Sequence, residues 1–445
     1  MLNLPALSFS QGAKGATDLF VATFGSQPEG VWQAPGRVNV IGEHTDYNGG
    51  LAFPIALPHR AFVALSRRPD RLVRLVSSAD PSDVVSLDLD QVAPKGENGE
   101  VSGWAAYLVG VAWALEQDGL GPLPGFDIAL ESCVPLGAGL SSSAALECAV
   151  AVALDDVAGL ALAGPADNPS DVGRERLARL CCLAENKIAG APTGGLDQAA
   201  SLRCHAGHAL ALDCTDFSAE QVPFNLSESG LSLLVIDTRA PHALVDGQYA
   251  ARRSSCEQAA KLLEVELLAD LDPEQLDYNL ELLAQSAREQ GLQEQQVDTL
   301  VRRTRHVVSE IERTEKLIEL LQTQDLTDAA ALAEVGQLMN ASHDSLRYDY
   351  EVTVGELDTA VEAARAAGAI GARMTGGGFG GSAIALVHTQ ELEQVAQAIA
   401  QAFAKAGYRE PAFLQAEPGP GAGGLEWPTV TPTNKAVPLN EGVFL

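Results

Sequence analysis

Basic residues are scarce in this 445-residue chain. Lysine and arginine together number 29 against 59 aspartates and glutamates, which gives a formal net charge of −30. Such a charge favours solubility and argues against a nucleic acid as partner, because the phosphate backbone would be repelled. An acidic protein can still bind a nucleotide, provided that local hydrogen-bond donors and a divalent cation offset the repulsion.

The chain also lacks Cys-x-x-Cys pairs and long apolar runs. Its seven cysteines are an odd number, and in a chain of this size they indicate reduced, mostly buried thiols. There is no charged start followed by an apolar signal segment, and no apolar run near the roughly 20 residues that a membrane-spanning helix needs. We therefore expect a cytoplasmic protein with no membrane partner. No pattern in the chain indicates an oligomeric state.

What the chain does contain is a core-forming composition and clear periodicity. Hydrophobic residues make up 46% of the sequence, and the length is sufficient for two or three domains. Apolar patterns predict an opening helix over residues 5–26 and a second domain that starts near residue 221. The other predicted elements are strands over 52–66, 71–78 and 231–237, and helices over 104–116, 174–189, 273–290, 296–322 and 326–345.

Residues 134–145 combine a strand end, a glycine bend and a helix start, with the sequence Val-Pro-Leu-Gly-Ala-Gly-Leu-Ser-Ser-Ser-Ala-Ala. An alternating strand pattern over 126–130 precedes them, and a buried helix pattern over 144–154 follows. Serine is a favoured N-cap, and the first N–H groups of a helix have no partner inside it. Those N–H groups, the hydroxyls and the positive end of the helix dipole together suit an anion such as phosphate.

Other interpretations of this stretch stay open on these residues alone. An ordinary loop before a serine-capped helix is the simplest, although three serines after Gly-x-Gly supply more donors than one cap needs. The stretch is not the common NTPase loop, because no lysine precedes the serines. A dinucleotide fold is disfavoured, because Ser142 replaces the third glycine and no acidic residue follows on a second strand.

Residues 31–50 place charged side chains between glycines and a proline. A strand is predicted over 38–41 and a loop over 43–50, and Asn48-Gly49-Gly50 has the composition of a solvated turn. A turn does not explain arginine, glutamate, histidine and aspartate within ten residues. Carboxylates and an imidazole suit a polyhydroxylated ligand, because they form hydrogen bonds with hydroxyl groups. The polar residues are Arg37, Asn39, Glu43, His44, Asp46, Tyr47 and Asn48.

Three motifs carry a resemblance to a known family. Residues 36–48 resemble the galactokinase signature, and residues 137–143 resemble the ATP-phosphate loop of the wider GHMP kinase family. Residues 374–381, Met-Thr-Gly-Gly-Gly-Phe-Gly-Gly, resemble that family's third motif. The Gly-x-Gly-x-x-Gly within this motif is not a dinucleotide fingerprint, because a helix pattern precedes it and a strand pattern follows. The motifs occur in order, and the resemblance covers roughly residues 31–415.

The resemblance implies a fold and an activity. The fold class is α/β (α+β), a two-domain GHMP kinase architecture with the active site in the cleft between the domains. The N-terminal domain would span 1–220 and the C-terminal domain 221–415, with a flexible tail over 416–445. The implied activity is that of a galactokinase, which moves the γ-phosphate of ATP to the anomeric hydroxyl of D-galactose in galactose metabolism. Mg²⁺ is the implied cofactor.

By the same resemblance, Asp197 is the catalytic aspartate, Arg37 stabilises the developing charge, and Ser143 and Glu185 bind Mg²⁺. Two protein ligands suffice, because Mg²⁺ keeps several waters and binds substrate phosphates. Without the resemblance, Asp197 is explained as the cap of a helix that starts at Gln198. The residues implied for the sugar are Glu43, His44, Thr45, Asp46, Gly194 and Tyr249. Those implied for the nucleotide are Ser78, Gly137, Ala138, Gly139, Leu140, Ser141, Ser142 and Ser143.

Two alternative functions remain. One is a kinase for N-acetylgalactosamine or another aldose, which pocket residues outside the motifs would decide. The other is a non-catalytic galactose and ATP sensor on the same fold, disfavoured because Arg37, Glu185 and Asp197 are all present.

A zinc site is a further possibility at residues 204–208, which contain one cysteine and two histidines. Three ligands within five residues, with no second cluster, do not complete a tetrahedral set. We expect instead a hairpin turn between strands at 201–204 and 208–212.

Overall fold

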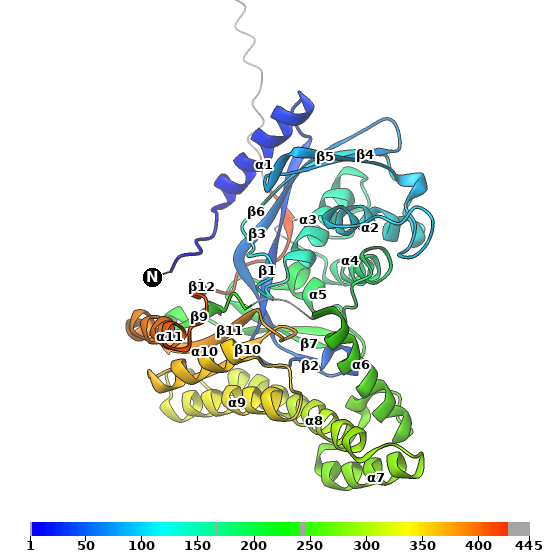
Figure 1. Cartoon of the computed structure of the whole chain (residues 1–445). Helices are drawn as coiled ribbons and strands as arrows, with labels where there is room; N and C mark the ends of the chain where they lie inside the picture. Colours follow the sequence, from blue (N-terminus) through cyan, green and yellow to red (C-terminus); the bar gives the residue numbers. More distant parts are fainter. Residues whose placement is uncertain (1, 166–167, 241–244, 426–445) are drawn as a thin grey trace, which may run out of the picture.

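The computed structural model describes residues 2–165, 168–240 and 245–425. Figure 1 shows two α/β halves stacked along the long axis, with the N-terminal half above and the C-terminal half below. Within the described residues, no helix is long and apolar enough to cross a membrane.

The upper half is built on a six-stranded sheet in the order β13-β1-β3-β6-β4-β5. Helix α1 (Phe9–Phe24) covers one face, and four helices lie on the other side (Figure 1). The middle strands are buried because both faces are covered, as expected for continuous apolar runs. The strands are β1 (Gly30–Asn39), β3 (Pro54–Arg67), β4 (Leu72–Ser77), β5 (Asp80–Asp88), β6 (Phe126–Ser132) and β13 (Gly423–Gly424). The four helices are α2 (Trp104–Gln117), α3 (Ser142–Val157), α4 (Asp171–Ala184) and α5 (Leu196–Arg203).

A small antiparallel sheet lies where the two halves meet. It contains β2 (Leu51–Ala52), β7 (His208–Asp213) and β8 (Ala219–Pro223), with β7 in the middle. The boundary expected near residue 221 falls inside β8, which pairs with β7. The exact division between the domains therefore stays a prediction.

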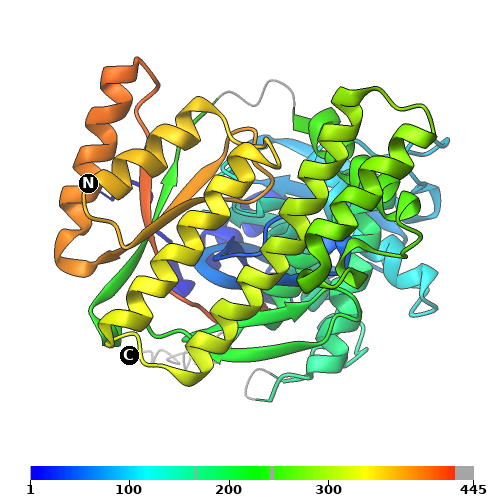
Figure 2. The same ribbon diagram turned by 90° about the horizontal axis from the view of Figure 1, so that it is seen from below.

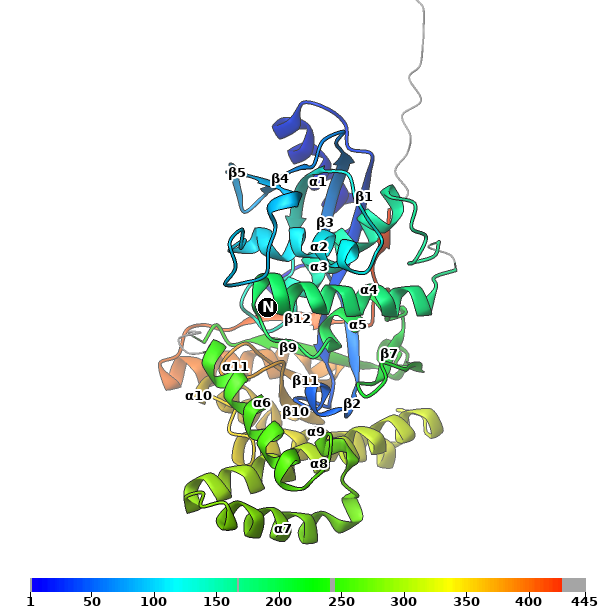
Figure 3. The ribbon, with the colours of Figure 1, turned by 90° about the vertical axis from the view of Figure 1, so that its right-hand side faces the viewer.

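The lower half contains a four-stranded antiparallel sheet in the order β10-β11-β9-β12. Seen from below, α8 and α9 run side by side beneath this sheet (Figure 2). In Figure 3, α6 runs from the level of the sheet down towards α7, which lies at the bottom of the molecule. The strands are β9 (Leu231–Asp237), β10 (Gly371–Thr375), β11 (Ser382–His388) and β12 (Ala412–Ala416). The helices are α6 (Val245–Leu262), α7 (Leu276–Glu289), α8 (Glu294–Thr323), α9 (Ala329–Tyr348), α10 (Gly355–Ala366) and α11 (Leu392–Ala406).

Most of the predicted elements are confirmed. The opening helix is shorter than predicted and begins at Phe9, because Ser8 and Gln11 form a capping box. The predictions that agree are those for β3, β4, β6, β9, α2, α3, α7, α8 and α9.

The strand predicted over 201–204 is wrong. Helix α5 continues to Arg203, and its buried side chains bind distant backbone: Ser201 donates to the Pro35 carbonyl at 2.7 Å, and Arg203 donates to the Phe217 carbonyl at 2.6 Å. Four residues of local pattern cannot outweigh these tertiary contacts. The second predicted strand is confirmed as β7, which starts at His208.

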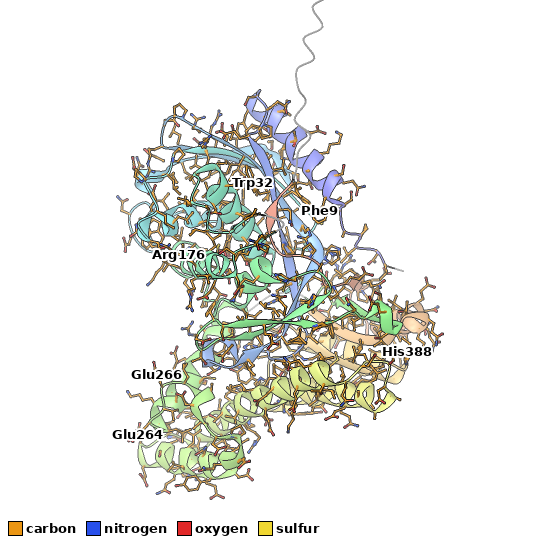
Figure 4. All side chains as sticks on the ribbon, turned by 180° about the vertical axis from the view of Figure 1, so that it is seen from behind. Phe9, Trp32, Arg176, Glu264, Glu266 and His388 are labelled. Carbon is orange, nitrogen blue, oxygen red and sulfur yellow. The ribbon has the colours of Figure 1, made fainter. Side chains whose placement is uncertain are left out.

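The flexible tail predicted from residue 416 is wrong for its described part. The Gly419 and Gly421 N–H groups donate to the Ala56 and Cys204 carbonyls at 2.9 and 2.7 Å, and β13 pairs with β1. This segment lacks periodicity because its backbone, rather than an apolar face, makes the contacts. Figure 4 shows Trp32, whose pairing partner in β13 is Gly424, and Phe9 of α1 in this part of the molecule. Residues 426–445 lie outside the described residues.

Candidate active site

A cavity of about 140 Å³ lies between the two halves. Its wall contains seven of the side chains named from the sequence, contributed by β1, the loop after it, the end of α4, α5 and α6. The seven are Arg37, Glu43, His44, Asp46, Glu185, Asp197 and Tyr249, and the remaining lining residues are Pro192, Thr193, Leu196, Gly376 and Gly377.

Arg37 and Asp197 are in direct contact in this wall. The Arg37 Nη2 lies 2.7 Å from Asp197 Oδ1, and the Arg37 Nη1 donates to the Gly139 carbonyl at 2.7 Å. The arginine side chain is 7% exposed and the aspartate side chain 24%. Asp197 lies in the first turn of α5, after the N-cap Gly195, so the capping explanation is wrong. One guanidinium therefore joins the carboxylate to the glycine-serine bend.

The bend over residues 137–143 has unusual backbone geometry. Gly137, Gly139 and Ser141 have φ values of 70°, 69° and 56°, in the left-handed region. Helix α3 begins at Ser142, but the Ser141 side chain makes no cap, and its buried Oγ has no hydrogen-bond partner among the described residues. The expected serine cap is therefore absent from the described structure, which leaves the first N–H groups of α3 without a side-chain cap.

The third glycine motif packs against this bend from the lower half. The Ser382 hydroxyl donates to the Ala138 carbonyl at 2.7 Å. A Cβ atom at Gly376 would lie 2.9 Å from the Gly139 carbonyl oxygen, so a side chain there would force the two loops apart. Gly376 and Gly377 also line the cavity, and Gly376 allows the backbones of the two halves to approach.

Glu185 lies where α4 gives way to one turn of π-helix, Glu185–Ala189, a distortion that often marks functional sites. Its side chain is beside Ser143. Burial and the neighbouring Asp197 carboxylate raise the pKa of Glu185 to about 7, although hydrogen bonds with Ser143 and Gln198 oppose the shift. Burial and nearby negative charge thus disfavour the ionised form. A hydroxyl and such a carboxylate are a donor set that fits Mg²⁺.

Gln198 links Glu185 to a second buried acid. Its Nε2 donates to Glu185 Oε2 at 2.5 Å and to Glu147 Oε2 at 2.9 Å. Glu147 is fully buried on α3, and burial and the Glu185 carboxylate raise its pKa well above the usual value. Neither Gln198 nor Glu147 was predicted from the sequence to be part of the site. Among the described residues, no group of three or more histidine, cysteine, aspartate or glutamate side chains could hold a metal ion by itself.

The loop after β1, residues 43–50, also contributes to the cavity wall through Glu43, His44 and Asp46. Glu43 accepts a hydrogen bond from the Gly376 N–H at 2.8 Å and contacts Arg373 Nη1 at 3.4 Å. Burial and the Asp197 carboxylate raise the pKa of Asp46 to about 6. A Cβ atom at Gly194 would lie 2.2 Å from Asp46 Oδ2, which explains why glycine is needed there.

His44 has a φ of 64°, and burial lowers the pKa of its imidazole to about 3, so the ring is neutral. Its ring centroid lies 4.7 Å from that of Tyr350 and 5.5 Å from that of Tyr249, so two aromatic rings flank it.

Ten of the predicted contact residues do not line the cavity in the described part of the chain: Thr45, Gly194, Ser78 and residues 137–143. Thr45 is fully buried, and its hydroxyl lies 2.8 Å from the Leu51 carbonyl oxygen, so its side chain stabilises the loop. Ser78 follows β4, and its N–H donates to the Leu130 carbonyl in β6 at 2.9 Å. It lies beside the strand that leads into the glycine-serine bend.

A buried ionic network behind Glu43 was also missed from the sequence. Arg373 of β10 and Glu310 of α8 are both fully buried, with Arg373 Nη2 lying 3.7 Å from Glu310 Oε1. Glu310 also accepts the Gly42 N–H at 3.1 Å. Although burial raises the pKa of Glu310, the Arg313 and Arg373 guanidiniums lower it to about 2. A sequence signal exists: Glu310 falls at helical spacing from the buried residues Val307, Thr314 and Leu317.

Comparisons with known proteins agree with this geometry. The family model described as the galactokinase galactose-binding signature matches residues 18–67, and the models for the N-terminal domain and the C-terminal region of GHMP kinases match 106–205 and 317–405. A galactokinase of Streptomyces coelicolor is 46% identical over 403 residues, covering 91% of this chain and 96% of the relative. A galactokinase of Mycobacterium tuberculosis is 40% identical over 390 residues, covering 87% and 97%.

The same relationship holds in three dimensions. The crystal structure of Lactococcus lactis galactokinase complexed with galactose matches with a TM-score of 0.80 and 35% identity, covering 92% of this chain and 98% of that one. A mevalonate kinase structure with 15% identity and a TM-score of 0.55 shares the fold alone. The α/β two-domain architecture and the family resemblance predicted from the sequence are both confirmed. This chain belongs to the galactokinase family of the GHMP kinases.

Proposed function

We propose that this protein transfers the γ-phosphoryl group of ATP to the anomeric hydroxyl of D-galactose, giving galactose 1-phosphate and ADP. The observation that carries the proposal is the Arg37–Asp197 contact at 2.7 Å in the wall of a cavity that Glu43, Asp46 and Glu185 also line. The same guanidinium donates to the Gly139 carbonyl and so connects this wall to the glycine-serine bend. The 46% identity to a named galactokinase over nearly the whole chain supports the choice of sugar.

Phosphoryl transfer requires mainly positioning and charge stabilisation from the protein. We assign the sugar to Glu43, His44, Asp46 and Tyr249, with Gly194 leaving room for Asp46. Asp197 orients the attacking hydroxyl and accepts its proton. Arg37 stabilises the charge that develops on the attacking oxygen and the transferring group, because its guanidinium contacts both Asp197 and the bend.

We assign the triphosphate to residues 137–143, whose helix-start N–H groups lack a side-chain cap in the described structure. Ser143 and Glu185 would hold Mg²⁺, which neutralises phosphate charge when bound. Ser78 stays a prediction for the nucleotide. We also place the protein in the cytoplasm, where ATP is available and where seven free cysteines stay reduced.

The test is ADP release measured with Mg-ATP and galactose, N-acetylgalactosamine or no sugar. We expect turnover with galactose only. If ADP is released with N-acetylgalactosamine but not with galactose, the substrate is N-acetylgalactosamine. If galactose binds but no ADP is released, the protein is a sensor. Asp197→Asn should abolish turnover while galactose still binds. Asp18→Asn, on an exposed α1 side chain, is the control that should leave turnover unchanged.

A further inference from the structure

Behind the cavity, four polar side chains form a chain of hydrogen bonds that leads away from His44. The His44 Nδ1 lies 2.9 Å from the Tyr47 hydroxyl, which lies 2.7 Å from the Tyr350 hydroxyl. The Tyr350 hydroxyl lies 3.2 Å from Cys256 Sγ on α6. Tyr350 and Cys256 are at most 1% exposed, so no bulk water competes for these groups.

The other ring nitrogen of His44 is the end of the chain that faces the ligand. His44 is 4% exposed and lines the cavity, and its buried Nε2 has no hydrogen-bond partner of good geometry among the described residues. Burial lowers the pKa of the ring, and the backbone of Gly377, which also lines the cavity, is close enough to oppose that shift. A buried polar atom is costly to leave unpaired, so such an atom in a cavity wall indicates a group that awaits a ligand.

The direction of the hydrogen bonds decides which role Nε2 has. In a neutral imidazole one nitrogen donates and the other accepts, and the partner of the first determines the state of the second. A phenol is a stronger hydrogen-bond donor than a neutral imidazole N–H, and an imidazole nitrogen is a good acceptor. Burial and neighbouring Tyr350 raise the pKa of Tyr47 well above its usual value, so its hydroxyl keeps the proton that it donates.

We propose that Tyr47 is a positioning residue for the sugar site: its hydroxyl donates to His44 Nδ1 and so fixes the tautomer in which Nε2–H donates to one hydroxyl oxygen of the sugar. This inference rests on the proposed function, because it names how one residue of the same site recognises galactose. When they are ionised, the carboxylates of Glu43 and Asp46 accept hydrogen bonds from sugar hydroxyls but cannot donate any. His44 thus adds a donor to a wall of acceptors, and Tyr47 and Tyr350 hold it in that state.

The test is Tyr47→Phe, which removes one oxygen and keeps the ring. We expect the galactose KM to rise about tenfold, while kcat and the KM for ATP change less than twofold, because uniform binding is lost. Tyr348→Phe is the matched control, since its ring is 63% exposed. Its kinetic constants should equal those of the unsubstituted protein. If Tyr47→Phe does not fold, Tyr350→Phe tests the same chain, because it removes the hydroxyl that lies 2.7 Å from that of Tyr47.

A panel of monodeoxy and deoxyfluoro galactoses separates positioning from a structural effect. Fluorine accepts weakly but does not donate, so at the position bound by His44 the fluoro sugar should be used better than the deoxy sugar. In Tyr47→Phe, the preference for the fluoro over the deoxy sugar should disappear at this position. The preferences at the other sugar positions should be unchanged. Equal analogue preferences in Tyr47→Phe and the unsubstituted protein, or an unchanged galactose KM, would overturn the inference. Calorimetry of the unsubstituted protein with galactose reports on the proposed function separately, since absence of binding there would contradict that function.

Discussion

Arg37 and Asp197 form the central contact of this molecule, although 160 residues of sequence separate them. The guanidinium lies 2.7 Å from the carboxylate and 2.7 Å from the carbonyl oxygen of Gly139. The end of β1, the start of α5 and the glycine-serine bend therefore meet at one side chain. Substitution of that side chain tests whether the meeting point is the reaction centre.

Arg37→Met should lower kcat by about 10²–10³-fold, the usual effect of removing one donor that stabilises developing charge. Steady-state ADP release at saturating galactose and ATP measures this. Arg67→Met is the control, because that arginine is 50% exposed and pairs with Glu29. If Arg37→Met keeps a kcat within twofold of the unsubstituted protein, Arg37 has no part in the chemical step.

Gly194→Ala should weaken galactose binding at least tenfold and leave ATP binding unchanged. The new Cβ would lie 2.2 Å from Asp46 Oδ2, so the carboxylate must move out of the sugar site. Gly423→Ala is the matched control, because a Cβ there meets no described atom within 4 Å. Calorimetric titration with each substrate gives both affinities. Equal galactose affinity in the two variants would show that Asp46 does not contact the sugar.

The raised pKa of Asp46 predicts how the free energy of unfolding depends on pH. Burial and Asp197 raise its pKa from the ordinary 3.8 to about 6, so the folded state binds this proton more tightly than the unfolded state does. The free energy of unfolding should therefore fall as pH rises from about 4 to 6 and stay level above, with a total loss on the order of 3 kcal/mol from this group.

Asp46→Asn removes this dependence. Denaturant unfolding without ligands should show the variant more stable than the unsubstituted protein at pH 8 and the two converging near pH 4. Asp216→Asn is the control, because burial of its carboxylate is negligible and its hydrogen bonds with Ser218 lower its pKa. A stability difference between Asp46→Asn and the parent that does not change with pH would show that Asp46 titrates normally.

Gln198→Met should raise the Mg²⁺ concentration needed for half-maximal binding of Mg-ATP by about tenfold, the usual effect of losing a residue that orients a metal ligand. The amide that donates to Glu185 at 2.5 Å is removed, while the volume is kept. Glu147→Gln is the matched control and should leave the Mg²⁺ requirement unchanged. Burial and the Glu185 carboxylate raise the pKa of Glu147, and a glutamine there still offers an oxygen to the Gln198 amide. Nucleotide fluorescence titrated with Mg²⁺ measures both, and an unchanged Mg²⁺ requirement in Gln198→Met would exclude this role.

The parts of the site that the sequence predicted are those whose chemistry is local. Arg37, Glu43, His44 and Asp46 lie within one stretch of ten residues, where charged side chains between glycines depart from an ordinary strand. The glycine-serine bend, which we propose for the triphosphate, was likewise predicted from a local pattern, because strand, glycines and serines follow one another. Asp197, in contrast, has the local appearance of a helix cap, and only the family resemblance indicated its role.

What the sequence did not predict depends on contacts between distant segments. The pattern of α8 indicates charged faces in solvent, but Glu310 on that helix is fully buried against Arg373 of β10. The segment after β12 has no periodicity, yet its backbone N–H groups bind carbonyls of the N-terminal half. Residues 201–203 of the predicted strand belong to α5 for the same reason, and Cys204 is the C-cap of that helix. Each of these outcomes depends on a partner that no local window contains.

The buried contacts of Glu310 and Arg373 predict that one substitution lowers both the free energy of unfolding and the affinity for galactose. Glu310→Ala removes the buried carboxylate that lies 2.8 Å from Arg313 Nε and 3.7 Å from Arg373 Nη2. Removing one partner of a buried ionic pair costs about 3–5 kcal/mol. The Gly42 N–H also loses its acceptor. Denaturant unfolding measures the loss, and the galactose KM should rise because Arg373 also contacts Glu43.

Glu312→Ala, on the same helix with a 42% exposed side chain, is the control and should change stability by less than about 0.5 kcal/mol. If the two variants unfold at the same denaturant concentration, the buried network does not stabilise the junction of the two halves, and Glu43 must be oriented by the Gly376 N–H alone.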